Sequence, residues 1–329
     1  MSVQITIVGL GQIGASVGLA LSEHTNIVHR VGHDRDVGIA RRAEKAGALD
    51  KVMINLPSAV READLVLLSL PMDQIRETLA IIAPDLKEGA VVMDTGPVKE
   101  VVASWAGELL PEDRYYVGLT PVLNPIYLRA VDSGVDAAHP DLFRGGLMAI
   151  VSPLHTPSEA IKLAADLTRL LGAGPLFADP LEMDGLMAAT HTLPQLIAAA
   201  LLNATVDQPG WNEGRKVAGR SYTEATSAIM HPTSAETLKA AALLNRDNVI
   251  RVVDGLIASL QTIRNDIEGN QADALEERLK RAREGQERWW KERQSASWTG
   301  EEAPAVEMPK ASDLFGRLLG MGGRGRNEE

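Results

Sequence analysis

The stretch Ile5-Thr6-Ile7-Val8-Gly9-Leu10-Gly11-Gln12-Ile13-Gly14 decides the fold. A G-x-G-x-x-G pattern follows an apolar, β-branched run and opens a segment with helical spacing. In such a unit the first glycine permits a tight turn, the second lets the backbone approach a pyrophosphate, and the third lets the helix pack against the strand. The N-terminus of the helix faces the anion. The stretch therefore predicts a dinucleotide-binding strand–turn–helix unit at the start of the chain.

The second apolar run ends at Gly32-His33-Asp34, roughly 20 residues after the glycines, where a ribose-binding carboxylate belongs. Asp34 favours NAD, because a carboxylate there repels the 2′-phosphate of NADP. Arg35 beside it leaves NADP open. The alternative is a glycine turn and a surface aspartate in an α/β protein that binds no nucleotide.

Two further strand ends should face the same crevice, because ligands bind at the carboxyl ends of parallel strands. Ser69-Leu70-Pro71 ends the third predicted strand and Asp94-Thr95-Gly96-Pro97 ends the fourth. The alternative is that Pro71 and Pro97 only stop strands. The predicted cofactor contacts are Gly9, Gly11, Gln12, Ile13, Gly14, Asp34, Arg35, Ser69, Pro71 and Asp94.

Apolar runs of strand length alternate with segments of helical spacing through the first half of the chain. Several are nearly continuous Val, Ile and Leu, which is typical of strands buried on both faces of a parallel sheet. The alternation predicts an α/β fold, with a doubly wound Rossmann-type parallel sheet in a dinucleotide-binding domain over residues 1–180. The predicted strands are Ile5–Val8, Ile27–Gly32, Leu65–Leu70, Val91–Asp94, Tyr115–Gly118, Leu147–Val151 and Pro175–Ala178.

The apolar pattern then becomes helical and predicts an all-helical substrate and dimerisation domain over 181–294. Two long helices are expected at Asp184–Ala204 and Thr233–Ile267, with an irregular Gly-rich segment, Gln208–Arg220, between them. Residues 295–329 are polar or Gly-rich and predict a linker and a flexible tail.

Composition excludes several classes of function. The 329 residues are 45% hydrophobic, include no cysteine and carry a net charge of −11. The absence of cysteine removes disulfides, thiolate nucleophiles and cysteine-ligated metals, and no metal site is expected. The acidic balance argues against nucleic acid as the main partner. We find no signal peptide and no uninterrupted apolar run of about 18 residues, so we expect a cytoplasmic protein without a membrane partner.

Several segments, in order and spacing, resemble the prephenate/arogenate dehydrogenase family over roughly residues 1–270. The resemblance implies oxidative decarboxylation, in which a base takes the substrate's hydroxyl proton, hydride passes to NAD or NADP, and carbon dioxide leaves. It also implies a carboxylate substrate in tyrosine biosynthesis and a homodimer through the helical domain. The segments are Val8–Ser16, Gly32–Arg35, Asp94–Lys99, Asp141–Gly145, Leu193-Pro194-Gln195 and Asn245-Arg246.

The departures from the family pattern concentrate where that chemistry lies. The family's base is a histidine in a Gly-x-His-Pro segment, and Thr120 stands there in Gly118-Leu119-Thr120-Pro121. Losing a general base costs roughly 10²–10⁴ in rate. The other departures are Pro97 for a serine, Met183-Asp184 for a His-Asp pair, His191-Thr192-Leu193-Pro194-Gln195 for Ser-His-Leu-Pro-His, and Ser227 for a substrate-binding arginine.

Other residues are candidates for the missing roles. Of the seven histidines, only His191 lies on the helix that should line the crevice. Pro194 frees the Thr190 carbonyl and predicts a kink beside His191. We therefore expect His191 and Thr120 to be catalytic, the latter through a hydroxyl that binds a ligand or positions a water. The alternative is that His191 is a partly buried structural histidine whose ring nitrogens form hydrogen bonds within the protein.

Lys99 and Arg220 are the candidate cations for a substrate carboxylate; solvated surface charges are the alternative. Three functions remain open. The first is an NAD(P)-dependent prephenate or arogenate dehydrogenase. The others are a catalytically silent nucleotide-binding homologue acting as a sensor or assembly subunit, and a dehydrogenase for a different carboxylate.

Overall fold

A computed structural model describes residues 2–130, 132–230 and 234–295. The chain divides into two compact units, one of residues Met1–Asn245 and one that begins at Arg246. Each unit is described by itself. The predicted linker and tail lie outside the described residues, apart from Ser295.

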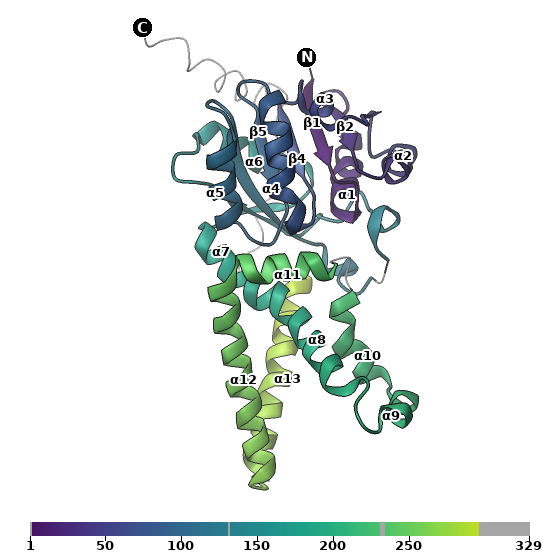
Figure 1. Cartoon of the computed structure of the whole chain (residues 1–329), viewed down its shortest axis with the longest axis vertical. Coiled ribbons are helices and arrows are strands. Elements are labelled where there is room, and N and C mark those ends of the chain that lie inside the picture. Colours follow the sequence, from purple (N-terminus) through teal and green to yellow (C-terminus); the bar gives the residue numbers. More distant parts are fainter. Residues whose placement is uncertain (1, 131, 231–233, 296–329) are drawn as a thin grey trace. The chain divides into compact units, whose positions relative to one another are not determined.

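The first unit is built on one eight-stranded sheet with the order β3-β2-β1-β4-β5-β6-β7-β8. Figure 1 labels four of these strands, β1, β2, β4 and β5. All neighbouring strands are parallel except β6 and β7. The first six strands follow the Rossmann order. The strands are β1 (Val3–Val8), β2 (Val28–His33), β3 (Lys51–Val52), β4 (Leu65–Leu68), β5 (Val91–Asp94), β6 (Tyr115–Val122), β7 (Leu147–Val151) and β8 (Gly174–Phe177).

Helices cover both faces of the sheet, and each face has its own apolar cluster. Alternate strand residues divide between the clusters, with Ile7 and Leu67 in one and Val8 and Leu68 in the other. This period of two is what a strand buried on both faces requires. The doubly wound fold is therefore confirmed. The helices are α1 (Gln12–Ala20), α2 (Val37–Lys45), α3 (Leu56–Val60), α4 (Met72–Ile82), α5 (Glu100–Leu109) and α6 (Ser158–Leu170).

The predicted strands all occur, with ends shifted by a few residues. The sheet is not wholly parallel, because β7 runs against β6. A long connection, with short 3-10 helices at Pro125–Tyr127 and Gly134–Ala137, lies between these two strands. Strand β3 and helix α3 were not predicted, since a two-residue strand carries no periodicity.

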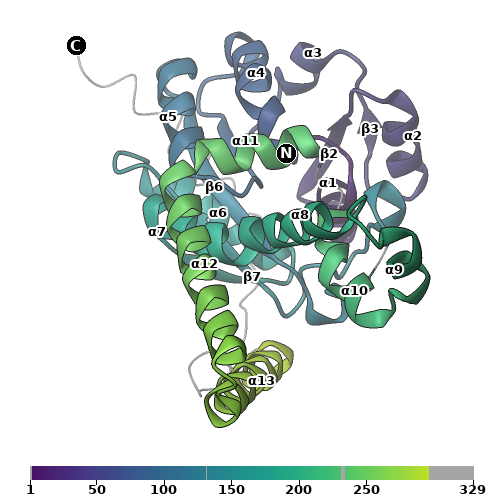
Figure 2. The ribbon, with the colours of Figure 1, turned by 60° about the horizontal axis from the view of Figure 1, so that its bottom comes forward.

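The helical part of the first unit starts with one continuous helix, made of α7 (Pro180–Met187), a π turn η5 (Ala188–Thr192) and α8 (Leu193–Thr205). The kink predicted beside His191 takes the form of this π turn. Helices α8 and α11 (Ala235–Leu244) lie across the end of the sheet at which the parallel strands finish (Figure 2).

The sequence predicted an irregular Gly-rich segment, but the structure shows that part of this segment is helical. It contains α9 (Trp211–Val217) and is followed directly by α10 (Arg220–Thr226). Gly210 precedes α9 with φ +89°, a conformation that glycine adopts without a Cβ penalty. A local turn therefore allows a helix where composition alone indicated a loop.

One helix among the described residues, Pro180–Thr205, is long and apolar enough to cross a membrane by length and composition. Its most apolar window has a mean hydropathy of 1.4 and is only 22% buried. The core helix of a soluble protein passes the same test, so this is weak evidence. The beginning of this helix is folded into the first unit, because Asp184 on it is buried and bonded to α5.

The second unit is a helical hairpin of α12 (Arg246–Glu268) and α13 (Ala272–Ser295). An ion pair of 2.8 Å between Arg278 Nε and Asp266 Oδ2 joins the helices near the turn. The single helix predicted over Thr233–Ile267 is wrong, because the chain leaves the helical conformation at Asn245, with φ −114° and ψ 37°.

Candidate functional site

Strand register brings the predicted crevice residues together at one edge of the sheet. Val8 pairs with Leu68, Leu68 with Asp94, and Asp94 with Gly118. The turn that follows each strand therefore lies beside the next. The glycine loop, the Ser69–Pro71 turn and the segment that reaches Thr120 share the carboxyl edge, as the sequence predicted.

The glycine loop has the shape that a pyrophosphate needs. Gly9 has φ +90°, and a Cβ on it would lie 2.2 Å from the Ser69 carbonyl oxygen. A Cβ on Gly14 would lie 1.9 Å from the Gly9 carbonyl oxygen, so only glycine lets α1 pack this closely. A Cβ on Gly11 would meet no atom within 4 Å. Gly11 precedes α1 without a side-chain cap, so this open space lies where the first backbone N–H groups of the helix lack intrahelical acceptors.

Asp34 lies at the end of β2, next to the glycine loop. Its Oδ2 accepts a hydrogen bond of 2.8 Å from the Leu10 backbone N–H, and its Oδ1 accepts one of 2.9 Å from Asp36. The carboxylate is thus held beside the turn, at the place expected for a ribose contact. The loop and Asp34 together fit a dinucleotide.

The remaining predicted cofactor contacts surround this cradle. Gln12 donates from Nε2 to the Ala137 carbonyl oxygen at 3.1 Å, which ties α1 to the long β6–β7 connection. Ile13 and Ser69 are half-buried, whereas Arg35 and Pro71 are exposed. Their roles as cofactor contacts stay predictions.

Asp94 and Lys99 form a buried cluster rather than the open crevice contacts that we expected. The Lys99 ammonium lies 2.9 Å from Asp94 Oδ2, and both side chains are fully buried. Asp94 also accepts hydrogen bonds from Tyr116 Oη at 2.6 Å and the Gly96 N–H at 2.7 Å. Protein donors thus occupy both carboxylate oxygens of Asp94. A cofactor or substrate could bind either side chain only by displacing these partners.

Burial sets the protonation chemistry of this cluster. Desolvation lowers the pKa of Lys99, although the Asp94 carboxylate opposes that shift. Burial also raises the pKa of Tyr116 well above its usual value, and the Asp94 charge adds to the rise. Tyr116 therefore donates its phenolic proton to Asp94 and stays neutral. Its role was missed in the sequence, where the only signal was a tyrosine at a buried strand position that needs a polar partner.

Thr120 occupies β6 beyond the row formed by Asp94 and Gly118. Its side chain is buried, and its Oγ1 has no hydrogen-bond partner among the described residues. A buried hydroxyl without a partner costs roughly 1–3 kcal/mol. The structure thus places an uncommitted donor and acceptor where the sequence predicted a ligand contact.

His191 lies on the π turn and is exposed at its surface. The Nε2 atom of buried Gln195 lies 3.3 Å from His191 Nε2 and donates to the His191 carbonyl oxygen at 3.1 Å. π turns occur frequently at functional sites. Arg220, by contrast, is exposed and forms an ion pair of 2.8 Å with Glu224 on its own helix, so its predicted substrate contact has no support from these interactions.

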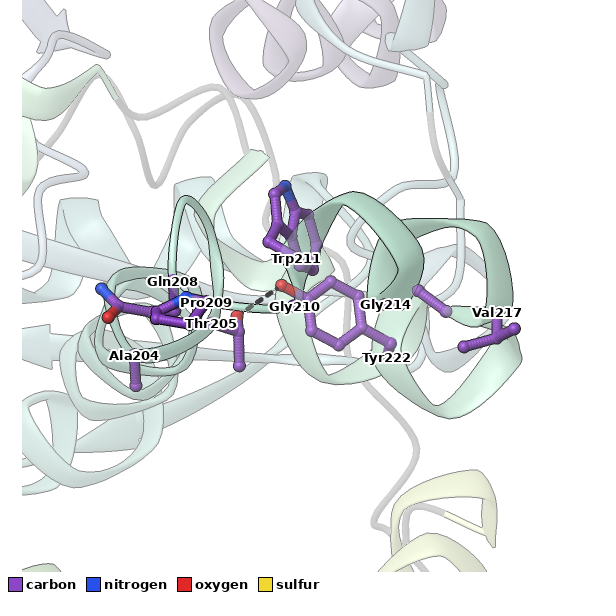
Figure 3. Close-up of a pocket in the computed structure, with 10 residues that line it drawn as sticks. Ala204, Thr205, Gln208, Pro209, Gly210, Trp211, Gly214, Val217 and Tyr222 are labelled. Carbon is purple, nitrogen blue, oxygen red and sulfur yellow. Dashed lines mark hydrogen bonds between the residues drawn. The ribbon is translucent and has the colours of Figure 1, made fainter.

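A pocket lies away from this edge, between α8, α9 and α10 (Figure 3). It has a volume of about 400 Å³ and includes Trp211 and a hydrogen bond of 2.8 Å between Thr205 Oγ1 and Tyr222 Oη. No carboxylate, histidine or lysine lines it, and the titratable side chain in its lining is Tyr222. The described residues also hold no group of three side chains suited to a metal ion.

Comparison with known families identifies two domains that together span most of the chain. The prephenate dehydrogenase nucleotide-binding domain matches residues 17–175, and the prephenate dehydrogenase dimerization domain matches residues 179–281. The chain belongs to the prephenate dehydrogenase family. The family's nucleotide-binding domain contains most of the sheet described above, and the cofactor is NAD or NADP.

Individual relatives agree with this assignment. The chain is 29% identical to the cyclohexadienyl dehydrogenase of Zymomonas mobilis subsp. mobilis over 84% of its own length and 92% of that protein. It is 25% identical to the prephenate dehydrogenase of Bacillus subtilis over 85% and 74% of the two chains. These relatives are oxidoreductases, and they favour the dehydrogenase interpretation over a silent homologue.

Solved structures of the family share the fold. The A. aeolicus prephenate dehydrogenase, in complex with hydroxyphenyl propionate and NAD⁺, superposes with a TM-score of 0.77 at 22% identity, covering 88% of this chain and 98% of that one. The Synechocystis arogenate dehydrogenase superposes with a TM-score of 0.68 at 21% identity, covering 87% and 99%.

Proposed function

We propose that the protein is an NAD(P)-dependent dehydrogenase that oxidatively decarboxylates prephenate or arogenate. The observation that carries the proposal is the glycine cradle, because its open Gly11 and the carboxylate of Asp34 match a dinucleotide. Asp34 favours NAD over NADP. Family membership supplies the substrate class, because the relatives are named cyclohexadienyl, prephenate and arogenate dehydrogenases.

The bound nicotinamide supplies the hydride acceptor, and the chain supplies acid–base and orienting groups. The amide nitrogen of Gln195 can only donate, so its contact with His191 Nε2 favours the tautomer with the ring proton on Nδ1. When substrate replaces this contact, Nε2 has the lone pair needed to accept a hydroxyl proton. The uncommitted Thr120 hydroxyl gives the substrate a second, neutral hydrogen-bond partner.

We also propose that the functional division lies near residue 180, with nucleotide binding in 1–180 and substrate binding and dimerisation in 181–294. The bounds of the two family matches support this division. Exposed apolar side chains on α8 and α12, among them Ile197 and Ile257, support a homodimer through the helical part.

The test is turnover by the purified protein with prephenate or arogenate and each nicotinamide cofactor, followed by absorbance of the reduced nicotinamide. Loss of the base in His191→Ala should lower kcat about 10²- to 10⁴-fold. His155→Ala, at another exposed histidine, is the control and should leave kcat unchanged. Tight cofactor binding without turnover on either substrate would overturn the proposal and favour a silent homologue.

A further inference from the structure

Helix α5 has an N-terminus that another helix caps. Its N-cap residue, Lys99, makes no side-chain capping hydrogen bond. The Asp184 carboxylate, from α7, accepts the Lys99 backbone N–H at 2.5 Å and the Glu100 backbone N–H at 3.1 Å. A negative charge at this position satisfies two orphan donors and the helix dipole together. Asp184 thus links the nucleotide-binding layer to the helical segment.

The same link reaches the strand ends through the side chain of Lys99. Its ammonium binds Asp94, the last residue of β5, and Asp94 in turn binds Tyr116 of β6 and the Gly96 N–H. Lys99 therefore binds Asp184 through its backbone N–H and binds the carboxyl edge of the sheet through its side chain. These side chains are at most 4% exposed, so water competes little for the contacts.

A third element joins at the same point. The Asn245 side chain, at the end of α11, donates to the Asp184 carbonyl oxygen at 2.7 Å. Asp184 is 2% exposed and Asn245 is 6% exposed. The α7 helix is therefore anchored by its carboxylate on one side and by its backbone on the other.

We propose that Asp184 is a positioning residue for the reaction, an inference that rests on the proposed function. The helix continues from Asp184 through the π turn to His191 and Gln195, so the anchor fixes the start of the helix that carries these two side chains. Asp184 does not act as a base itself, because backbone N–H groups occupy both of its carboxylate oxygens. A misplacement of about 1 Å costs about 10²-fold in rate.

The kinetic test compares Asp184→Asn with Asp179→Asn. The amide at residue 184 keeps the side-chain shape but offers one oxygen to two N–H donors. Asp179 caps α7 itself, through hydrogen bonds from Leu181 and Glu182, and neither of these reaches α5, so it is the matched control. We expect kcat to fall about 10- to 100-fold in Asp184→Asn and to change less than about threefold in the control. The Kd for NADH, from fluorescence, should stay within about threefold in both, since the cradle lies on β1 and α1.

A second readout does not depend on turnover. The chain has no cysteine, so Ser104→Cys on α5 and Ala200→Cys on α8, both exposed, accept spin labels selectively. Labelled subunits diluted with unlabelled protein give the α5–α8 distance by double electron–electron resonance. We expect the distribution to shift or broaden in Asp184→Asn and in the milder Asn245→Ala, and to stay unchanged in Asp179→Asn.

The two readouts separate the inference from the proposed function. A wild-type protein without turnover on either substrate overturns the proposed function, whatever the label distances show. An unchanged distance distribution in Asp184→Asn and Asn245→Ala overturns the positioning role. Equal losses of kcat in Asp184→Asn and Asp179→Asn overturn it too, because they would reflect only a weakened helix start.

Discussion

Gly11 and Gly14 are glycines for different physical reasons, although they belong to one motif. Space for a methyl group exists at Gly11 and is absent at Gly14. A Cβ on Gly14 would lie 1.9 Å from the Gly9 carbonyl oxygen. The first position reserves room for a ligand, whereas the second reserves room for the fold. Alanine substitutions should therefore separate binding from stability.

We predict that Gly11→Ala melts within a few degrees of the wild type but loses at least tenfold in NADH affinity, because its methyl group enters the pyrophosphate space. Gly14→Ala should lower the melting temperature clearly, because the methyl group forces α1 away from β1. Thermal melts and fluorescence titration with NADH check both. Equal effects of the two substitutions on stability would contradict this division.

Thr120 gives a second prediction at this scale. Thr120→Val keeps the shape of the side chain and removes a buried hydroxyl that has no partner among the described residues. The free energy of unfolding should stay constant or rise by about 1 kcal/mol. If the hydroxyl binds substrate, KM for the substrate should rise about tenfold or kcat should fall by a similar factor. Urea denaturation and steady-state kinetics measure the two effects, and unchanged kinetics would remove Thr120 from the site.

At the scale of elements, an ion pair between buried Arg30 and the partly exposed Asp50 fastens β2 to the loop before β3. Arg30 donates to Asp50 through Nε at 3.2 Å and through its terminal nitrogen at 2.6 Å, and also binds the Gly18 and Gly47 carbonyl oxygens. Burial raises the pKa of Asp50, but the hydrogen bonds and charge of Arg30 outweigh it and hold the pKa below its usual value. The ionised carboxylate therefore stabilises the fold at pH values above the unfolded pKa of about 3.9.

We predict that Asp50→Asn lowers the free energy of unfolding by about 2 kcal/mol at pH 7, because buried Arg30 loses the counter-charge of a partly exposed carboxylate. The difference in the free energy of unfolding between Asp50→Asn and wild type should shrink as the pH falls below about 4 and through the lowered pKa of Asp50 in the folded state, because the carboxylate of the wild type then becomes protonated. Urea denaturation at several pH values measures it. Glu108→Gln, in the exposed pair with Arg76, is the control and should cost less than about 1 kcal/mol. A pH-independent difference would contradict the role of the charge.

Element boundaries show where local pattern stops being informative. The strands were predicted well because Val, Ile and Leu runs with flanking glycines are local signals. The break between α11 and α12 was not predicted, because the apolar spacing continues through Asn245. A contact to Asp184, distant in the sequence, coincides with this break. Tertiary hydrogen bonds can thus end a helix whose own residues would continue it.

At the scale of the whole molecule, the exposed apolar face of α12 predicts association. Ile250, Ile257, Leu260 and Ile267 are each 45–62% exposed, and they recur on one side of the helix. The dimerization domain of the family includes this helix. We predict that Ile257→Glu shifts the protein from dimer toward monomer in sedimentation equilibrium. Ser259→Glu adds the same charge to another side of α12 and should leave the dimer intact. A monomeric wild type would refute the proposed dimer.

The sequence by itself determined the class of fold, the cofactor cradle and the family. These depend on signals a few residues long: the spacing of three glycines, the period of the strands and the Asp34 position. Only the tertiary structure decided what Asp94, Lys99 and Asp184 do. Their partners lie on other elements, and burial makes Asp94 and Lys99, which were predicted as ligand contacts, part of an internal ionic network with Asp184. Water solvates a charged side chain, whereas burial imposes a desolvation penalty that partner groups must offset. The role of a buried charge therefore depends on which groups the fold places next to it.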